Sequence, residues 1–554
     1  MCGILGYSYL DIDSKFSDID FIKSLEHRGP DANGFFKDEF ISLLHTRLSI
    51  VDIESGHQPY EYDDLVITFN GEIYNHVKLK NQLKAHGYEF ETNSDTEVLL
   101  KAFHYYGKSC TEHLNGMYAF CIYNKVDRSI IFCRDHFGIK PLYIYRDNKG
   151  IAFSSEMKSL MFFLNSNNID YSINDSALTE FIDNSFIEKN HLIKNIFPVK
   201  PGYFIEINKN CVNETKSPFN KNLCSSDLSS AIEDELKEQL QADVEVGILL
   251  SGGIDSSLLT ALSSKFNKNL KTFSIAFDGE KEDESKYSRK VSKIFKTSHF
   301  EYSFSERDLI KFIPSLINSM DTPIYDPAML PLLYLAKNVS NEVKVALSGD
   351  GGDEIFAGYT HHRIIKYKRL FKTISSLLGV INLNSNIKRI IDGSLATNPD
   401  LESSLRYDLF SGLDKQLLRK TDLCSMQYGL EVRVPFLSPR IFNYSNQFKR
   451  STFINILYGK LPLRKLTAKL VSFQIGFKKK QGFRIPLQKW VSSDSLGSNI
   501  KDDLLENCII PSCVFSAPDI KNLFLNKDKN YEIIFKLFIL NKWLYANKNN
   551  NSYL

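Results

Sequence analysis

In the first half of the chain, the cysteine at position 2 is a candidate catalytic residue because of its side chain and its position near the terminus. The initiator methionine is normally removed before a small residue, and Cys2 would then be the chain terminus. A terminal cysteine offers a thiol nucleophile and an α-amine, with a pKa of about 8, that can accept the thiol proton directly or through water. On its own, Cys2 is more often an ordinary second residue, so its interpretation depends on the surrounding motifs.

Five motifs follow Cys2 in the first 205 residues. They are residues 27–31 (HRGPD), 47–52 (RLSIVD), 70–75 (NGEIYN), 94–97 (SDTE) and 134–143 (RDHFGIKPLY). In this order they resemble the N-terminal-nucleophile glutaminase domain of class II glutamine amidotransferases, over nearly all of residues 2–205. The resemblance implies a four-layer αββα fold in which Cys2 attacks the side-chain amide of glutamine.

The resemblance also implies a glutamine site, made of Arg47, Val51, Asn70, Gly71, Glu72 and Asp95. Arg47 and Asp95 have the charges that hold the α-carboxylate and α-amine of glutamine. The Asn70 side chain and the Gly71 backbone N–H can form an oxyanion hole, because glycine lets the backbone approach closely. Glu72 is expected to contact the substrate amine or the loop. Two structural alternatives stay open: Arg47 in a surface salt bridge, and Asn70-Gly71 as a plain hairpin turn.

Two glycine-rich loops in the second half follow short apolar strands. Residues 250–257 (LSGGIDSS) come before a helix, so backbone N–H groups and the helix N-terminus can bind phosphate. This loop lacks the GxxxxGK[ST] pattern and is similar to the SGGxDS pyrophosphate loop of enzymes that cleave ATP between its α- and β-phosphates. Residues 347–354 (LSGDGGDE) place three carboxylates among glycines, which indicates Mg²⁺ binding and proton handling.

The chain as a whole resembles the B-type, glutamine-hydrolysing asparagine synthetase family from residue 2 to about residue 495. Further motifs are Asp422 with Ser425-Met426, residues 430–437 (LEVRVPFL), Gly459-Lys460 with Leu463-Arg464, and residues 480–483 (KQGF) with Pro486 and Trp490. The resemblance implies an ATP site at Leu249, Ser251, Gly252, Gly253, Asp255, Ser256, Ile275, Ser348 and Gly349, and Mg²⁺ at Asp255 and Asp353. It implies that Lys460 neutralises the reacting phosphates and that Asp350 acts as a base or positions the substrate.

Three departures from the family pattern leave the acceptor open. Asp350 stands where many asparagine synthetases have glutamate, and Ser438 stands where the LExRxPFLD pattern has aspartate. Residues 321–327 (DTPIYDP) resemble a branch that includes amidotransferases acting on surface polysaccharides. Aspartate, giving asparagine, is the first hypothesis, and a sugar acid or other carboxylated metabolite is the second. A catalytically inactive scaffold and a free-standing glutaminase are less favoured, because both sets of motifs are complete.

The predicted secondary structure that positions these residues changes near residue 208, from mostly strands to alternating helices and strands. Before it, the patterns predict strands at 65–69, 117–123, 129–133 and 203–207, a turn at Asn70-Gly71, and helices at 75–86 and 95–106. After it, helix 231–241, strand 246–250, a helix from Ser256, strand 272–277 and helix 287–295 predict a doubly wound parallel sheet. We therefore expect domains at 1–207 and 228–545, a linker at 208–227 and a disordered tail at 546–554. Residues 370–404 have an apolar helical pattern without a motif.

Composition excludes several classes. The 554 residues carry 68 Lys and Arg against 66 Asp and Glu, a formal charge of +2, so we expect no nucleic-acid partner. No segment approaches the roughly 20 apolar residues that span a bilayer, so we expect no membrane partner. The nine cysteines form no CxxC pair, which favours reduced thiols in the cytoplasm. The expected partners are glutamine, ATP with Mg²⁺, and the acceptor, and the family resemblance implies a possible homodimer.

Overall fold

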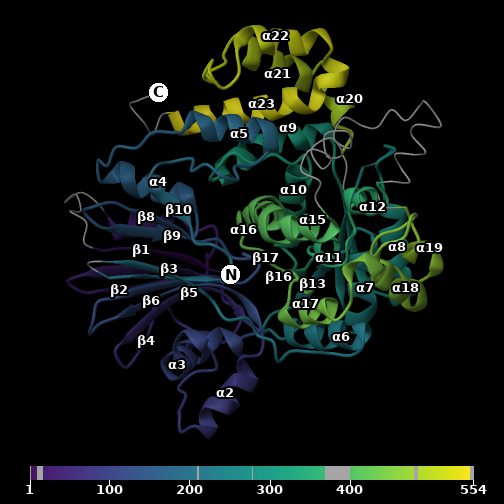
Figure 1. The fold of residues 1–554 in the computed structure, drawn as a ribbon. Helices are drawn as coiled ribbons and strands as arrows, with labels where there is room; N and C mark the ends of the chain where they lie inside the picture. Colours follow the sequence, from purple (N-terminus) through teal and green to yellow (C-terminus); the bar gives the residue numbers. More distant parts are fainter. Residues whose placement is uncertain are drawn as a thin grey trace.

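The computed structural model describes residues 2–8, 17–208, 211–277, 279–368, 400–479 and 485–548. Its N-terminal domain contains two six-stranded sheets (Figure 1). The first consists, in spatial order, of β10 (Ile196–Pro198), β8 (Tyr143–Arg146), β9 (Ile151–Ser154), β1 (Gly3–Ser8), β3 (Ile41–Arg47) and β2 (Ala32–Lys37). The second consists of β12 (Val212–Lys216), β11 (Tyr203–Ile207), β7 (Ile130–Arg134), β6 (Gly116–Asn124), β5 (Leu65–Ile73) and β4 (Tyr60–Tyr62).

The two sheets stack through an apolar layer that includes Ile4 and Leu43 from the first sheet and Val66, Ala119 and Phe132 from the second. Helices cover the outer faces. Those beside the first sheet are α1 (Asp18–Lys23), α4 (Met157–Ser166) and α5 (Asp175–Asn184), and those beside the second are α2 (His76–Ala85), α3 (Asp95–Tyr106) and the 3₁₀ turn η1 (Gly107–Glu112). The predicted αββα architecture is confirmed.

Two local predictions in this domain are wrong. The Asn70-Gly71 pair does not end a strand in a turn, because β5 continues through it and pairs with β6 from Leu65 to Ile73. Gly71 has a φ of 155°, and a Cβ there would collide with the Met117 carbonyl oxygen, so the position requires glycine. The expected linker also contains a strand: β12 pairs with β11. All five β12 residues are exposed, so the strand lacks the apolar alternation by which strands are recognised.

The C-terminal domain is built on five parallel strands. Their order is β15 (Ser298–Ser303), β14 (Lys271–Ala276), β13 (Val246–Leu249), β16 (Val345–Leu347) and β17 (Glu431–Arg433). One face packs on α6 (Leu228–Gln239), α7 (Ile254–Ser263) and α17 (Pro439–Asn446), and the other on α9 (Glu306–Ser319), α10 (Met329–Val339) and α16 (Arg419–Met426). Helices on both faces of a parallel sheet confirm the doubly wound prediction. α8 (Ser285–Phe295) lies beside β14 and β15.

Several shorter elements follow β16 along the chain. They are α11 (Gly352–Ile355), α12 (Thr360–Lys366), α15 (Leu401–Tyr407), the π-helix η2 (Asp408–Leu418), the 3₁₀ turn η3 (Arg450–Phe453), α18 (Leu461–Leu470) and α19 (Phe473–Gly476). Most of the 370–404 stretch and the KQGF motif at 480–483 lie outside the described residues.

Four helices complete the chain: α20 (Leu487–Val491), α21 (Leu496–Leu505), α22 (Ala517–Leu525) and α23 (Lys527–Lys548). In Figure 1, α23 lies along α5 and α9, and so touches both domains. Trp543 is fully buried there and donates to the Met320 carbonyl at 3.0 Å. Residues 546–548 of the expected tail belong to α23, and 549–554 lie outside the described residues.

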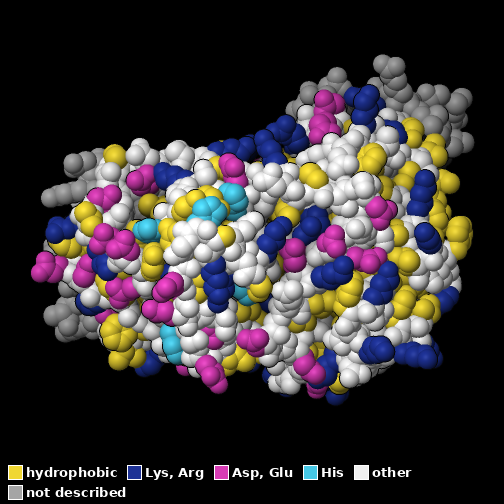
Figure 2. All heavy atoms as spheres, turned by 90° about the horizontal axis from the view of Figure 1, so that it is seen from below, with side chains coloured by type: hydrophobic (Ala, Val, Ile, Leu, Met, Phe, Trp, Pro, Cys, Tyr) yellow, Lys and Arg dark blue, Asp and Glu magenta, His cyan; other side chains and the backbone are white. Residues whose placement is uncertain are grey.

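None of the described helices is long and apolar enough to cross a membrane. On the face seen in Figure 2, acidic and basic side chains are interspersed, and neither sign covers the whole face.

Candidate active site

The Cys2 nitrogen, which becomes the α-amine when Met1 is removed, donates to Asn70 Oδ1 at 3.1 Å. Cys2 is 7% exposed and Asn70 is fully buried. The Asn70 Nδ2 group has no hydrogen-bond partner among the described residues. A buried amide donor without a partner is costly, so this N–H is suited to an oxygen supplied by a ligand. The arrangement fits the predicted oxyanion hole, with Gly71 next to Asn70 on β5.

The Cys2 thiol needs a base. Burial raises its pKa, and the positive charge of Arg47 only partly opposes that shift. The thiol is therefore protonated at neutral pH, and a neighbouring group must accept its proton before attack. The α-amine of the same residue is the nearest candidate once Met1 is removed.

Three of the predicted glutamine ligands lie near Cys2: Asn70 accepts from the Cys2 nitrogen, and the charges of Arg47 and Glu72 act on the Cys2 thiol. Arg47 is 5% exposed, and its guanidinium donates to the carbonyls of Val51, Asp52 and Ile53 at 3.3, 2.5 and 3.1 Å. It forms no ion pair with any described carboxylate, so the surface salt-bridge alternative is wrong. Its positive charge is held in place by carbonyl oxygens and is available to a substrate carboxylate.

Glu72 and Asp95 are the two acidic residues among the predicted glutamine ligands. Asp95 lies at the first residue of α3 and accepts the Ile73 N–H at 2.9 Å. Burial raises the pKa of both carboxyls, and for Glu72 the charge of Asp95 adds to that effect. A substrate ammonium placed between them would restore their charged forms. The Glu72 carboxylate also lies 3.6 Å from the Arg433 guanidinium of β17, in the other domain.

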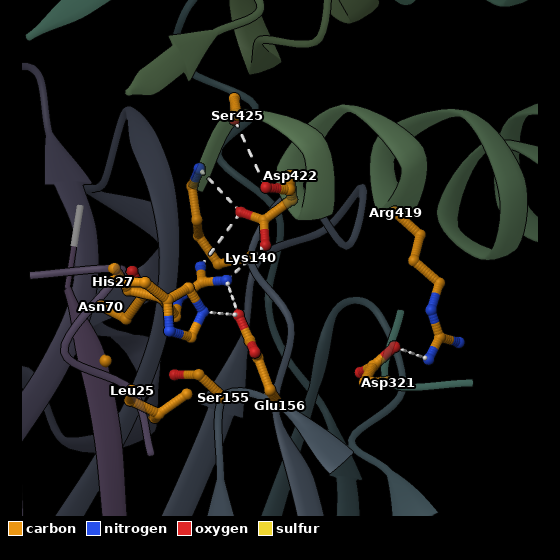
Figure 3. Close-up of polar contacts among 12 residues, drawn as sticks. Leu25, His27, Asn70, Lys140, Ser155, Glu156, Asp321, Arg419, Asp422 and Ser425 are labelled. Carbon is orange, nitrogen blue, oxygen red and sulfur yellow. Dashed lines mark hydrogen bonds and ion pairs between the residues drawn. The ribbon is translucent and has the colours of Figure 1, made fainter. Parts of the chain in front are cut away.

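Arg28 is a functional residue to which the sequence assigned no role, although its motif was recognised. It is fully buried and donates to the Cys2 carbonyl at 3.2 Å. Its guanidinium donates to Glu156 of the same domain and to Asp422 of α16, both at 2.8 Å. These two carboxylates are labelled in Figure 3. Lys140 lies 3.9 Å from Asp422. Arg28 thus joins the backbone of the nucleophile to the second domain, and Asp422, quoted above only as a motif residue, completes the contact.

The second site is a cavity of about 350 Å³ at the carboxyl ends of β13 and β16. Ligands of doubly wound sheets bind at this edge. Its walls contain these predicted residues: Leu249, Ser251, Gly253, Asp255, Ser256, Ile275, Ser348, Gly349, Asp350, Asp353 and Lys460. Gly252 does not line the cavity: its φ is 69°, and a Cβ would strike Tyr287. It allows the loop to turn.

Lys460 joins the two predicted metal ligands. Its ammonium lies 2.6 Å from Asp255 and 2.9 Å from Asp353, and it is 3% exposed. Burial opposes its charged form, but the two carboxylates outweigh burial and raise its pKa. These oxygens are the hard donors that Mg²⁺ prefers, and they share one wall of the cavity with a fixed positive charge. The residues present therefore fit a site for Mg²⁺ and phosphates.

Asp350 lies where the cavity meets α16. Its carboxylate accepts the Thr421 hydroxyl at 2.9 Å, and Lys420 forms an ion pair with Asp326 at 2.8 Å. Lys420 and Thr421 line the cavity, and no local motif marks them in the sequence. Asp326 belongs to the DTPIYDP stretch, but the sequence assigned it no role. Glu354 is also buried here, and burial together with Asp353 raises its pKa to about 7.

Together these features define a class of enzyme, in which an N-terminal-nucleophile glutamine amidotransferase domain precedes an ATP-binding domain of the pyrophosphate-loop type. Residues 1–219 match the family described as glutamine amidotransferase domain, and residues 227–544 match the family described as asparagine synthase. The chain belongs to the asparagine synthase family.

Relatives match over most of their length. Asparagine synthetase [glutamine-hydrolyzing] 1 of Bacillus subtilis is 32% identical over 562 residues, covering 89% of this chain and 88% of the relative. A putative asparagine synthetase [glutamine-hydrolyzing] of Mycobacterium tuberculosis is 28% identical, covering 85% and 84%. A putative asparagine synthetase [glutamine-hydrolyzing] 2 of Methanocaldococcus jannaschii is 34% identical, covering 71% and 82%.

Proposed function

We propose that this chain uses glutamine and ATP to convert a carboxylate into an amide, and that aspartate is the acceptor. Cys2 attacks the glutamine amide, ammonia leaves, and water hydrolyses the glutamyl thioester. The acceptor carboxylate attacks the α-phosphate of ATP and releases pyrophosphate. Ammonia then attacks the acyl group and displaces AMP. Glutamate, AMP, pyrophosphate and the amide are the products.

The observation that carries this proposal is the helix α16, which touches both sites. Its Asp422 binds Arg28, whose guanidinium holds the Cys2 carbonyl. One residue earlier, Thr421 donates to Asp350 at the edge of the ATP cavity. A free-standing glutaminase needs no such connection, whereas an enzyme that passes ammonia between two sites does.

Each polar group has a role in the proposed steps. Asn70 Nδ2 and the Gly71 N–H stabilise the oxyanion on the glutamine carbon. Lys460 offsets the charge that develops on the phosphates. When bound at Asp255 and Asp353, Mg²⁺ supplies further neutralisation of the triphosphate. Asp350 is placed to accept a proton from attacking ammonia or to orient the acceptor.

One feature of the ATP cavity supports aspartate over a bulky sugar acid. Lys420 and Asp350 supply opposite charges at its edge, as an amino-acid acceptor requires. Ser438 caps α17 by accepting the Ile441 N–H at 3.2 Å, a role that aspartate performs equally well, so this departure carries no information about the acceptor.

The sugar-acid alternative keeps one observation in its favour. Asp326, from the DTPIYDP stretch, is the ion-pair partner of Lys420 beside the cavity, so this unusual stretch does reach the proposed acceptor site. Asp321, from the same stretch, binds Arg419 at 2.7 Å and the Met157 N–H at 3.2 Å, and so has a structural role between the domains.

The test is a mass-spectrometric assay of purified chain with glutamine, ATP, Mg²⁺ and aspartate. The expected result is asparagine formed one-for-one with AMP. A Cys2→Ala variant should lose the reaction with glutamine and keep it with ammonia. Glutamine hydrolysis and AMP formation that require a sugar acid instead of aspartate would assign the alternative acceptor. Glutamine hydrolysis with no AMP from any acceptor would refute the synthetase function.

We also propose a cytoplasmic location and a homodimer. All nine cysteines are free, which is consistent with a reducing compartment. Cell fractionation would test the location, and sedimentation equilibrium would test the assembly, because a monomer mass at all concentrations would exclude a stable dimer.

A further inference from the structure

Two adjacent histidines and an aspartate converge beside the ATP cavity, in residues that the proposed reaction does not use. His361 and His362 belong to α12, and Asp408 is the first residue of η2. The Nε2 atoms of both imidazoles lie 2.6 Å from the same oxygen, Asp408 Oδ2. One ligand atom from each residue lies within 4.8 Å of the others.

Among the described residues, the carboxylate of this cluster has no lysine or arginine partner. Asp408 is 17% exposed and His362 is fully buried. Within the described part of the chain, Asp408 forms ion pairs with these imidazoles and with no lysine or arginine. The neighbouring basic residues of α12 bind elsewhere: Arg363 donates to the Leu457 carbonyl, and Lys366 donates to the carbonyls of Ser451 and Ile454. A largely buried carboxylate with only imidazole partners is a typical environment for a metal ligand.

The cluster is also held in position by its surroundings. The Tyr359 ring stacks on His361 at 5.3 Å with an interplanar angle of 16°. The two imidazoles pack edge to face at 4.3 Å, so neither can rotate without displacing the other. Asp408 begins a π-helix, a rare conformation that is frequent at functional sites. Ligands with restricted rotation lose little entropy when they bind an ion.

We propose that His361, His362 and Asp408 bind a first-row transition metal ion of the Zn²⁺ type, at a site distinct from the Mg²⁺ site at Asp255 and Asp353. Two imidazoles and a carboxylate are suitable ligands for Zn²⁺, at distances of about 2.0–2.2 Å. Ligand atoms in such a tetrahedron lie roughly 3.3 Å apart. Each imidazole would therefore move away from Asp408 by less than about 1 Å, as the ion replaces the two N–H protons.

The position of this ion suggests a structural role. α12 follows the glycine loop that carries Asp350 and Asp353, and η2 continues directly into α16, which carries Thr421. The ion would fasten these two walls of the ATP cavity to each other. Three protein ligands leave the fourth position of a tetrahedron to water.

The experiment uses the full chain, stripped of metal with a chelator and then kept in excess Mg²⁺ so that the ATP-site carboxylates are occupied. Co²⁺ is titrated and followed by its visible absorption bands, and Zn²⁺ affinity is measured by competition with a chromophoric chelator. We expect one equivalent of either ion per chain. His361→Ala and Asp408→Asn should each weaken binding by at least tenfold, while circular dichroism verifies folding.

His104→Ala is the matched control. The His104 imidazole also lies beside an aspartate, at 3.3 Å from Asp63, but within the part of the chain that the structure describes this pair has no third metal-ligating residue. This variant should bind Co²⁺ and Zn²⁺ like the wild type. The proposal is overturned if wild-type chain shows no tetrahedral Co²⁺ bands, or if the two cluster variants retain wild-type Zn²⁺ affinity, since the cluster would then be hydrogen-bonded only.

Discussion

Replacing Asp422 by asparagine should weaken both the domain interface and the coupling of the two reactions. The Asp422 carboxylate accepts two hydrogen bonds from Arg28, at 2.8 and 3.2 Å, and lies 3.9 Å from Lys140. Both cationic side chains are at most 1% exposed. Asparagine has nearly the same shape but no charge, so it leaves Lys140 without this carboxylate and Arg28 with Glu156 alone.

The expected loss of stability follows from this geometry. Breaking a buried ion pair by removing one partner costs about 3–5 kcal/mol. Asparagine keeps one acceptor oxygen, and Glu156 remains 2.8 Å from Arg28, so we expect a smaller loss than that range, about 2–3 kcal/mol. With a urea slope of about 2–3 kcal/mol per molar, the midpoint should fall by roughly 1 M.

Tryptophan fluorescence during urea unfolding measures this change, because the chain's two tryptophans, Trp490 and Trp543, both lie in the C-terminal domain. A second assay measures glutamate released per amide formed, which should rise above the wild-type ratio as ammonia is lost between the sites. Asp20→Asn is the control: its partner Lys23 is exposed, and the change should cost at most about 0.5 kcal/mol. An Asp422→Asn variant with the control's midpoint and an unchanged ratio would refute the reasoning.

Three further changes test other parts of the structure. The Glu235 carboxyl, which accepts the Asn115 side chain across the domain interface, has its pKa raised to about 7 by burial and by Glu238. Because the folded pKa exceeds the unfolded value of about 4.3, its charge destabilises the fold increasingly from about pH 4.5 and fully above pH 7. Glu235→Gln should therefore raise the free energy of unfolding by on the order of 1–3 kcal/mol at pH 8 and by little at pH 4.5. Urea titrations at both pH values measure this difference, and equal gains at the two pH values would contradict this account. Gly358→Ala places a methyl group against Asp353 and Lys460. ATP-dependent amide synthesis should therefore fall by at least about a hundredfold, while glutamine hydrolysis persists. A parallel loss of both activities would indicate misfolding. Gly71→Ala should abolish glutamine hydrolysis and spare ammonia-dependent synthesis, and retention of hydrolysis would exclude the oxyanion role of this strand position.

Local sequence was sufficient to predict elements whose boundaries are set by residues adjacent in the chain. The α3 boundaries, Asp95–Tyr106, were predicted correctly, because Ser94 caps the helix and Gly107 ends it. The loop between β13 and α7 was likewise predicted from its composition, since small residues and a helix start are sequence features. Its binding of phosphate stays a prediction. The same reasoning failed at β12, an exposed polar strand whose partner β11 supplies the pairing that its own composition does not suggest.

The sequence by itself determined the family and the fold class, because short motifs encode both. It also supplied Cys2 as the candidate nucleophile and the candidate residues of both sites, which stay predictions. Only the tertiary structure brought Arg28 to Asp422, residues 394 positions apart, and so connected the two sites through α16. Tertiary structure also decided that Asn70 and Gly71 continue a strand, since pairing with β6 outweighs the turn preference of that dipeptide. It placed His361 and His362 against Asp408 as well. Contacts of this kind depend on how distant elements pack, and no local pattern of residues records that packing.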